Sequence, residues 1–256
     1  FRSLGVAEWA LSQRIRAGDA VAQRIDALEM QLEGASMQDK PMSMRLERIL
    51  SLLLSEAVQW KDVEVPAALV LRSELARTLS PSTSKVGDEV LLTLRQDVVV
   101  DSHLVAGRGS RIVGKVTEVS KPRSFGRAAE VKVVMEKLLP LGPEEIPVTI
   151  GDAAKKASQA ESAQIAAAGT SFLGAILLGP LGLAGGFLVR GDAKEIPEGT
   201  PIYVQTVDTA RASGYPIPAG LASVVRDRDE NAPLSADAEP TPVERETKGP
   251  ERDGSK

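Results

Sequence analysis

Residues 87–120 read GDEVLLTLRQDVVVDSHLVAGRGSRIVGKVTEVS, and this stretch decides the fold class. Val90, Leu92 and Leu94 alternate with more polar positions, and a denser apolar run follows at 98–100. Side chains with a period of two point to opposite faces of a β-strand, so the pattern predicts strands rather than helix. The polar turn at 101–103 and the glycine-rich turn at 107–110 separate these strands. On the strand after that turn we expect Ile112, Gly114, Val116 and Glu118 to share one face.

Similar strand patterns occur on both sides of residues 87–120, which indicates that these strands belong to a larger domain. Strand-like stretches occur at 63–75, 129–139, 144–150 and 194–207, with a Pro-Leu-Gly-Pro turn at 140–143. Short strands at this spacing are typical of a small β-barrel or sandwich. We therefore predict a mainly β domain over residues 63–207, interrupted by an apolar segment at 165–189.

The N-terminal region, residues 1–60, has the period of amphipathic helices. Apolar residues recur at three- and four-residue spacings over 4–33 and again over 42–60. Gly18 and Asp19 offer a break with a new N-cap, Gly34 a stop, and Ser43 with Glu47 a second start. Packing of these helices on each other or on the domain is one reading, and a coiled-coil face for a partner is the other.

Composition narrows the class of function. The formal net charge is −4, cysteine is absent, and aromatic residues make up 3% of the chain. A base-stacking surface for nucleic acid would need more aromatic side chains and a positive field, so we expect no nucleic-acid partner.

The charged, proline-rich tail at 226–256 should be disordered because it has few large apolar residues to bury. We interpret the start at Phe1 as a sign that a leader or larger region precedes it.

Three motifs carry a resemblance to known proteins: KVGDEV at 85–90, QDV at 96–98 and GRGSRIVGKV at 107–116. They resemble a group of exported bacterial cell-envelope β-domains and, more distantly, the C-terminal β-barrel of TrbI/VirB10-like type IV secretion proteins. The resemblance covers about residues 63–207. The family's turn before a strand is kept as PEGT at 197–200, whereas residues 67–68 and 106–109 depart from it. For this chain the resemblance implies a helical insertion in the barrel that lines an outer-membrane pore in an oligomeric ring.

The apolar segment at 165–189, IAAAGTSFLGAILLGPLGLAGGFLV, contains no charged residue. A single helix of this length could cross a bilayer core of ~30 Å, but one crossing would separate the last strand from the others. We therefore predict a helical hairpin that turns at Gly179 and Pro180, associated with a membrane or capping one end of the barrel. The residues expected in this membrane or assembly hairpin are Phe172, Leu173, Gly174, Ile176, Leu177, Gly179, Pro180, Gly182, Gly185 and Phe187.

Few residues in the sequence are arranged in a pattern that indicates a catalytic site. His103 is the single histidine and lies in a polar turn, and no spacing requires Asp97, Asp101 and Glu118 to meet. We expect no enzyme activity, no metal and no cofactor. One local basic concentration could meet an anionic partner, although solvated charges on exposed strand faces and a loop are the simpler explanation. It consists of Arg108, Arg111, Lys115, Lys121, Arg123 and Arg127.

These expectations combine into one leading hypothesis and two alternatives. The leading hypothesis is a non-catalytic binding or assembly module of the cell envelope, periplasmic and membrane-associated or capped through the hairpin. Its partners would be envelope proteins or membrane lipid, with homo-oligomerisation left open. The first alternative is a VirB10/TrbI-like secretion-channel subunit that forms an oligomeric pore. The second, from another class, is a hydrolase that uses Asp97, Asp101 or His103.

Overall fold

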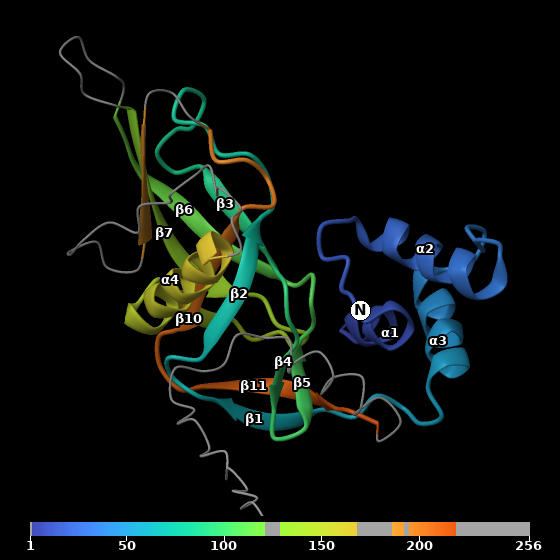
Figure 1. The fold of residues 1–256 in the computed structure, drawn as a ribbon. Helices are drawn as coiled ribbons and strands as arrows, with labels where there is room; N and C mark the ends of the chain where they lie inside the picture. The colour runs from blue at the N-terminus through green and yellow to red at the C-terminus, as the bar shows by residue number, and fades with distance from the viewer. Residues whose placement is uncertain (1, 121–128, 168–185, 192–194, 219–256) are drawn as a thin grey trace, which may run out of the picture.

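The computed structural model describes residues 2–120, 129–167, 186–191 and 195–218, which form a mainly β structure with helices at its N-terminal side (Figure 1). The helices are α1 (Ser3–Ser12), α2 (Val21–Glu33), α3 (Met42–Leu53) and α4 (Asp152–Ala167). The first strands are β1 (Lys61–Val65), β2 (Val70–Leu75), β3 (Glu89–Leu94), β4 (Val98–Val100), β5 (His103–Ala106) and β6 (Arg111–Ser120). The remaining strands are β7 (Ala129–Leu138), β8 (Ile146–Thr149), β9 (Gly186–Gly191), β10 (Pro201–Thr206) and β11 (Ala210–Pro216). The predicted tail at 226–256 lies outside the described residues.

Six strands close into a barrel, which confirms the predicted fold class. They follow the order β6-β3-β2-β10-β8-β7, and pairing of β6 with β7 closes the ring. Every pairing is antiparallel. Val90, Leu92 and Leu94 of β3 are buried while their neighbours are more exposed, so the predicted alternation of this strand is correct. The interior is packed with apolar side chains from all six strands.

A second sheet, β1-β11-β5-β4, forms a half-barrel against the first. Val63, Val105 and Ala212 from this sheet belong to the same buried cluster as the barrel interior. The two sheets therefore share one core. Strand β11 continues the β-structure beyond the predicted end at 207; its sequence ARASGYP is rich in small residues and lacks the apolar alternation of the other strands.

The irregular pairing of β6 with β7 shows that one residue of β6 does not lie on the face predicted for it. Val116 lies opposite Val133 and Glu118 lies opposite Lys132, so Thr117 is an extra residue on β6. Such a bulge exchanges the faces of the residues beyond it. Val116 is buried, but Glu118 is exposed and its Oε2 accepts a hydrogen bond from Lys132 Nζ at 2.5 Å. The expectation that Glu118 shares the face of Ile112 is therefore wrong.

Helix α1 lies between the barrel and helices α2 and α3 (Figure 1). Its Val6 and Trp9 pack with Leu104 and Tyr215 of the half-barrel. On its other side, Leu4 and Ala7 join a cluster with apolar residues of α2 and α3. These contacts agree with the reading in which the N-terminal helices pack on each other and on the domain.

The helix ends agree only partly with the sequence signals. Gly34 ends α2 with φ of 75°, as its freedom from a Cβ atom allows. The N-cap of α2 is Ala20 rather than Asp19, which instead pairs with Arg16. Helix α3 begins at Met42 after Pro41 and ends at Leu53, seven residues before the expected end at 60.

Candidate assembly surface

Helix α4 lies over the outer face of strands β2 and β10, and a charged group anchors it there (Figure 1). Glu161 of α4 accepts hydrogen bonds from Arg72 of β2 and from the Tyr203 hydroxyl of β10, the latter at 2.6 Å. Burial, and then the hydrogen bond to Glu161, raise the pKa of Tyr203 far above its usual range. At the other end of the helix, Gln205 Oε1 accepts the backbone N–H of Ala154 at 3.0 Å. The outer face of β10 is thus covered, which explains why Tyr203 is buried alongside the inward-facing residues of that strand.

The two ends of the apolar insertion are both attached to the barrel. The chain enters residues 168–185 from α4 and leaves them into β9, which pairs with β7 from Ala129↔Gly191 to Val134↔Gly186. Of the predicted hairpin residues, Phe187 lies in β9 opposite Val133. Residues 186–189 are therefore a strand, and the prediction that they form the second helical arm is wrong. Gly-Phe-Leu-Val also suits a strand, and pairing with β7 satisfies its backbone groups.

The other predicted hairpin residues lie outside the described residues. They are Phe172, Leu173, Gly174, Ile176, Leu177, Gly179, Pro180, Gly182 and Gly185. The helix preceding them, α4, was not predicted, because its alanine-rich sequence has no strong apolar stripe. Among the helices of the described ranges, none combines the length and the apolar character that crossing a bilayer requires.

The linker between α1 and α2 docks on the turn that joins β5 to β6. The backbone N–H of Ile15 donates to the carbonyl of Arg108 at 2.6 Å, and Arg111 Nη2 donates to the carbonyl of Gly18 at 3.1 Å. The turn approaches so closely that a Cβ atom on Gly109, whose φ is 94°, would lie 2.0 Å from the Ile15 carbonyl oxygen. Only glycine combines this backbone conformation with this contact.

Asp97 ties α1 to the same turn. Its Oδ2 accepts the indole N–H of Trp9 at 3.0 Å, and its Oδ1 accepts the backbone N–H of Arg108 at 2.7 Å. Asp97, considered as a catalytic carboxylate in the hydrolase hypothesis, therefore has two structural partners. His103 is in β5, with its Nδ1 2.6 Å from the carbonyl oxygen of Asp101. The described residues contain no cluster of three His, Asp or Glu side chains suited to a metal ion.

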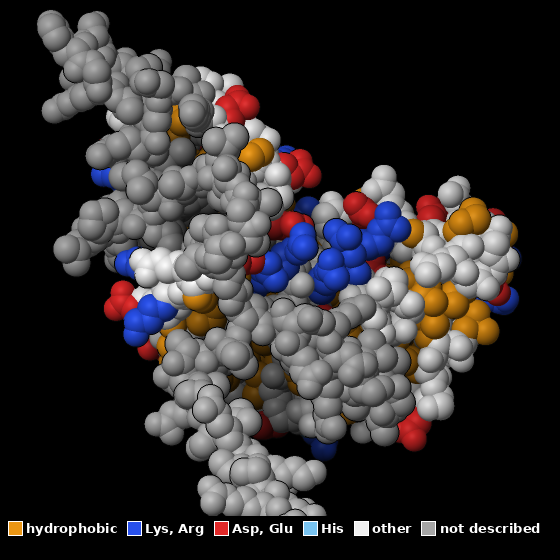
Figure 2. Space-filling view, in the orientation of Figure 1, with side chains coloured by type: hydrophobic (Ala, Val, Ile, Leu, Met, Phe, Trp, Pro, Cys, Tyr) orange, Lys and Arg blue, Asp and Glu red, His pale blue; other side chains and the backbone are white. Residues whose placement is uncertain are grey.

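The predicted basic patch is only partly described. Arg108, Arg111 and Lys115 lie on the β5–β6 turn and β6, whereas Lys121, Arg123 and Arg127 fall outside the described residues. Lys115 Nζ lies 3.2 Å from Glu136 Oε1, so its charge is balanced locally. The docked linker also brings Arg14 and Arg16 close to the segment that carries Arg108 and Arg111. The two pairs of arginines are far apart in the sequence, so the sequence alone did not predict this arrangement. A band of Lys and Arg side chains crosses the middle of this face, between the barrel and the N-terminal helices (Figure 2).

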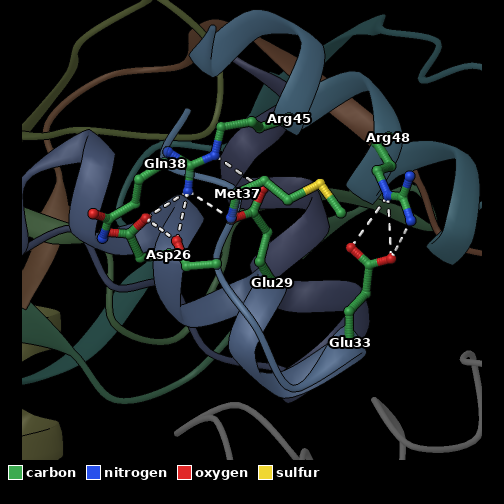
Figure 3. Close-up of polar contacts among 8 residues, drawn as sticks. Asp26, Glu29, Glu33, Met37, Gln38, Arg45 and Arg48 are labelled. Atoms are coloured by element: carbon green, nitrogen blue, oxygen red, sulfur yellow. Dashed lines mark hydrogen bonds and ion pairs between the residues drawn. The ribbon is translucent and has the colours of Figure 1, made fainter. Parts of the chain in front are cut away.

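A buried ion network connects α2 to α3 (Figure 3). Arg45 donates from Nε and Nη2 to the two oxygens of Glu29 at 2.9 and 2.6 Å, and also from Nη2 to Asp26 at 2.5 Å. The hydrogen bond from Arg45 holds the pKa of the buried Glu29 carboxyl below its usual range. Arg48 pairs with Glu33 on the exposed side of the same helices. The sequence marked these helices as amphipathic but gave no sign that charges would be buried between them.

Helices α2 and α3 also expose large apolar side chains. Met30, Met42, Met44 and Leu52 are each more than a third exposed. Met44, Arg48 and Leu52 follow one line along α3 at four-residue spacing. Apolar side chains gather over this part of the molecule (Figure 2). Exposed apolar groups of this kind often mark contact surfaces, and methionine adapts well to different partners.

Comparisons with known proteins found similarity only to solved structures. No family model matches the chain, and no curated protein matches it. Among solved structures, the chain is similar to ComB10 of the Com type IV secretion system of Helicobacter pylori. The identity is 12%, the TM-score is 0.27, and the overlap covers 56% of this chain and 86% of that one. At this identity and TM-score, the similarity supports no conclusion about activity or partners.

Proposed function

We propose that the chain is a non-catalytic assembly module of the bacterial cell envelope, in which the barrel is a rigid base for the apolar insertion. The observation that carries the proposal is the attachment of the insertion at both ends. Glu161 holds α4 through Arg72 and Tyr203, and six residue pairs hold β9 on β7. An uncharged segment presented from two fixed points is suited to contact a membrane or a protein surface.

The packing of the barrel limits where a partner could bind. Its interior is filled by apolar side chains, among them Leu71, Leu92, Ile112 and Val204. A binding function would then use the outer surface and the insertion, where side chains are available to a partner. Envelope proteins or membrane lipid are the proposed partners of the insertion, and the methionine-containing face of α2 and α3 is a proposed second protein contact.

Cell fractionation tests this proposal. We expect the native protein to sediment with membranes, and the double substitution L173D/L177D in the insertion to release it, since charges are costly in an apolar contact. Val86, an exposed apolar residue between β2 and β3, provides the matched control V86D, which should sediment like the native protein. Native protein found wholly in the cytosolic fraction would exclude the proposal.

The size of the detergent-extracted protein separates the proposed module from the channel hypothesis. Rings of defined symmetry would favour a secretion-channel subunit, and a monomer would argue against it. In either case, loss of membrane association in L173D/L177D would support the role proposed for the insertion.

A further inference from the structure

Two segments that each carry two arginines, distant in the sequence, meet where the N-terminal linker docks on the barrel. Arg14 and Arg16 come from the linker between α1 and α2, and Arg108 and Arg111 come from the β5–β6 turn and the start of β6. The Ile15–Arg108 backbone hydrogen bond holds the two segments together. We call this set of four the arginine junction.

Within the described residues, no ion pair balances the charges of Arg14 and Arg111, whereas Asp19 balances that of Arg16. Asp19 pairs with Arg16 at 2.9 Å, and Asp97 accepts hydrogen bonds from Trp9 and from the Arg108 backbone. The hydrogen bond of Arg111 goes to a neutral carbonyl, that of Gly18. Arg14 is exposed, and no ion pair joins it to a carboxylate of the described residues. Positive charge that is exposed and incompletely balanced attracts an acidic partner.

The chain itself contains a segment of the opposite charge. Residues 229–246 read DENAPLSADAEPTPVERE, in which Asp229, Glu230, Asp237, Glu239, Glu244 and Glu246 stand against the single base Arg245. The segment has two prolines in its second half and few large apolar residues, so its interactions must be mainly electrostatic.

The chain leaves the described fold on the same apolar cluster that the linker uses. Ile217 donates its backbone N–H to Ser102 at 3.1 Å and packs on the cluster that contains Trp9 and Ile15. Ten residues lie between position 218 and Asp229, and the eleven steps from one to the other span up to about 36 Å in an extended chain. The acidic segment can therefore reach the arginine junction of its own chain.

We propose that the acidic segment at 229–246 binds the arginine junction within the same molecule. The contact is independent of the proposed membrane role of the insertion. It would compete with any acidic protein for the same arginines, so that removing or neutralising the tail would open this surface. Because Arg14 and Arg16 are exposed to solvent, salt should screen the contact and weaken it.

A spin label on the tail of the full-length chain tests the proposal. The chain has no cysteine, so S235C gives a single attachment site within the acidic segment. At low salt we expect the label to broaden the amide NMR signals of residues 14–18 and 108–111, and not those of α3. The broadening should be lost in R14E and at roughly 0.5 M salt, where the Debye length falls below ~5 Å.

Two controls make the result decisive. K85E reverses one exposed charge before β3, at the far end of that strand from the β5–β6 turn, and should leave the broadening intact. Absence of broadening at low salt, or equal broadening in R14E, would overturn the proposal. So would broadening that arises only between molecules, detected by mixing spin-labelled chains with isotope-labelled, label-free chains.

Discussion

Replacing Arg45 with methionine should strongly destabilise the N-terminal helices. Arg45 is 4% exposed and is hydrogen-bonded to Glu29, which is fully buried. Methionine keeps much of the length of the side chain but leaves a buried carboxylate without its cation. Removing one partner of a buried ion pair costs about 3–5 kcal/mol, and we expect a loss of this size at pH 7.

The loss of stability in R45M should become smaller as pH falls. In the native protein the pKa of Glu29 is lowered, first by the hydrogen bond from Arg45, from its ordinary value of 4.5. The pairing therefore contributes its full stability above pH 4.5 and loses it as pH falls through the lower, folded-state pKa. In R45M, the buried Glu29 gains stability from protonation instead. The difference between the two proteins should shrink as pH falls from 7 towards about 4.

Urea unfolding at several pH values, followed by helical circular dichroism, measures this difference. The matched control is R48M, because Arg48 pairs with Glu33 on the same two helices but is half exposed. That substitution should cost only ~0–1 kcal/mol. Equal losses of stability in R45M and R48M at pH 7, or a loss in R45M that did not change with pH, would show that the buried ion pair does not stabilise the helices.

Two further substitutions test how the helices are attached to the barrel. G109A places a Cβ atom 2.0 Å from the Ile15 carbonyl oxygen and should speed proteolysis of the linker between α1 and α2. The control is G199A, because Gly199 also has a positive φ but has open space around it. This substitution should cost only ~1–2 kcal/mol of stability and leave the linker protected from proteolysis. Y203F removes one of the two donors to Glu161, so hydrogen exchange of α4 amides should speed up by about fivefold, equivalent to ~1 kcal/mol. Unchanged exchange in α4 would mean that this hydrogen bond does not hold the helix.

The strands could be predicted because burial on one face leaves a local pattern. Val90, Leu92 and Leu94 alternate in the sequence and point into the barrel. The pattern failed where pairing between distant segments decides the outcome. Whether Glu118 faces in or out depends on a bulge against β7, and no local feature of β6 marks it.

The candidate surface was harder to predict for the same reason. Arg14 and Arg111 lie nearly a hundred residues apart, and only the docking of the linker brings their segments together. The anchor at Glu161 joins three elements, each with an ordinary surface charge or tyrosine in its own sequence context. In the sequence, residues 186–189 continue an apolar run that is typical of a helix. Their pairing with β7, more than fifty residues earlier, could not be predicted from this local pattern.

Vesicle flotation of the purified chain tests whether the insertion holds the protein on a membrane, because it isolates the contact between the insertion and lipid. With vesicles of phosphatidylethanolamine and phosphatidylglycerol, we expect the native chain and V86D to rise with the lipid and L173D/L177D to stay behind. Native chain that remains at the bottom of the gradient, or L173D/L177D that floats as well as the native chain, would contradict it.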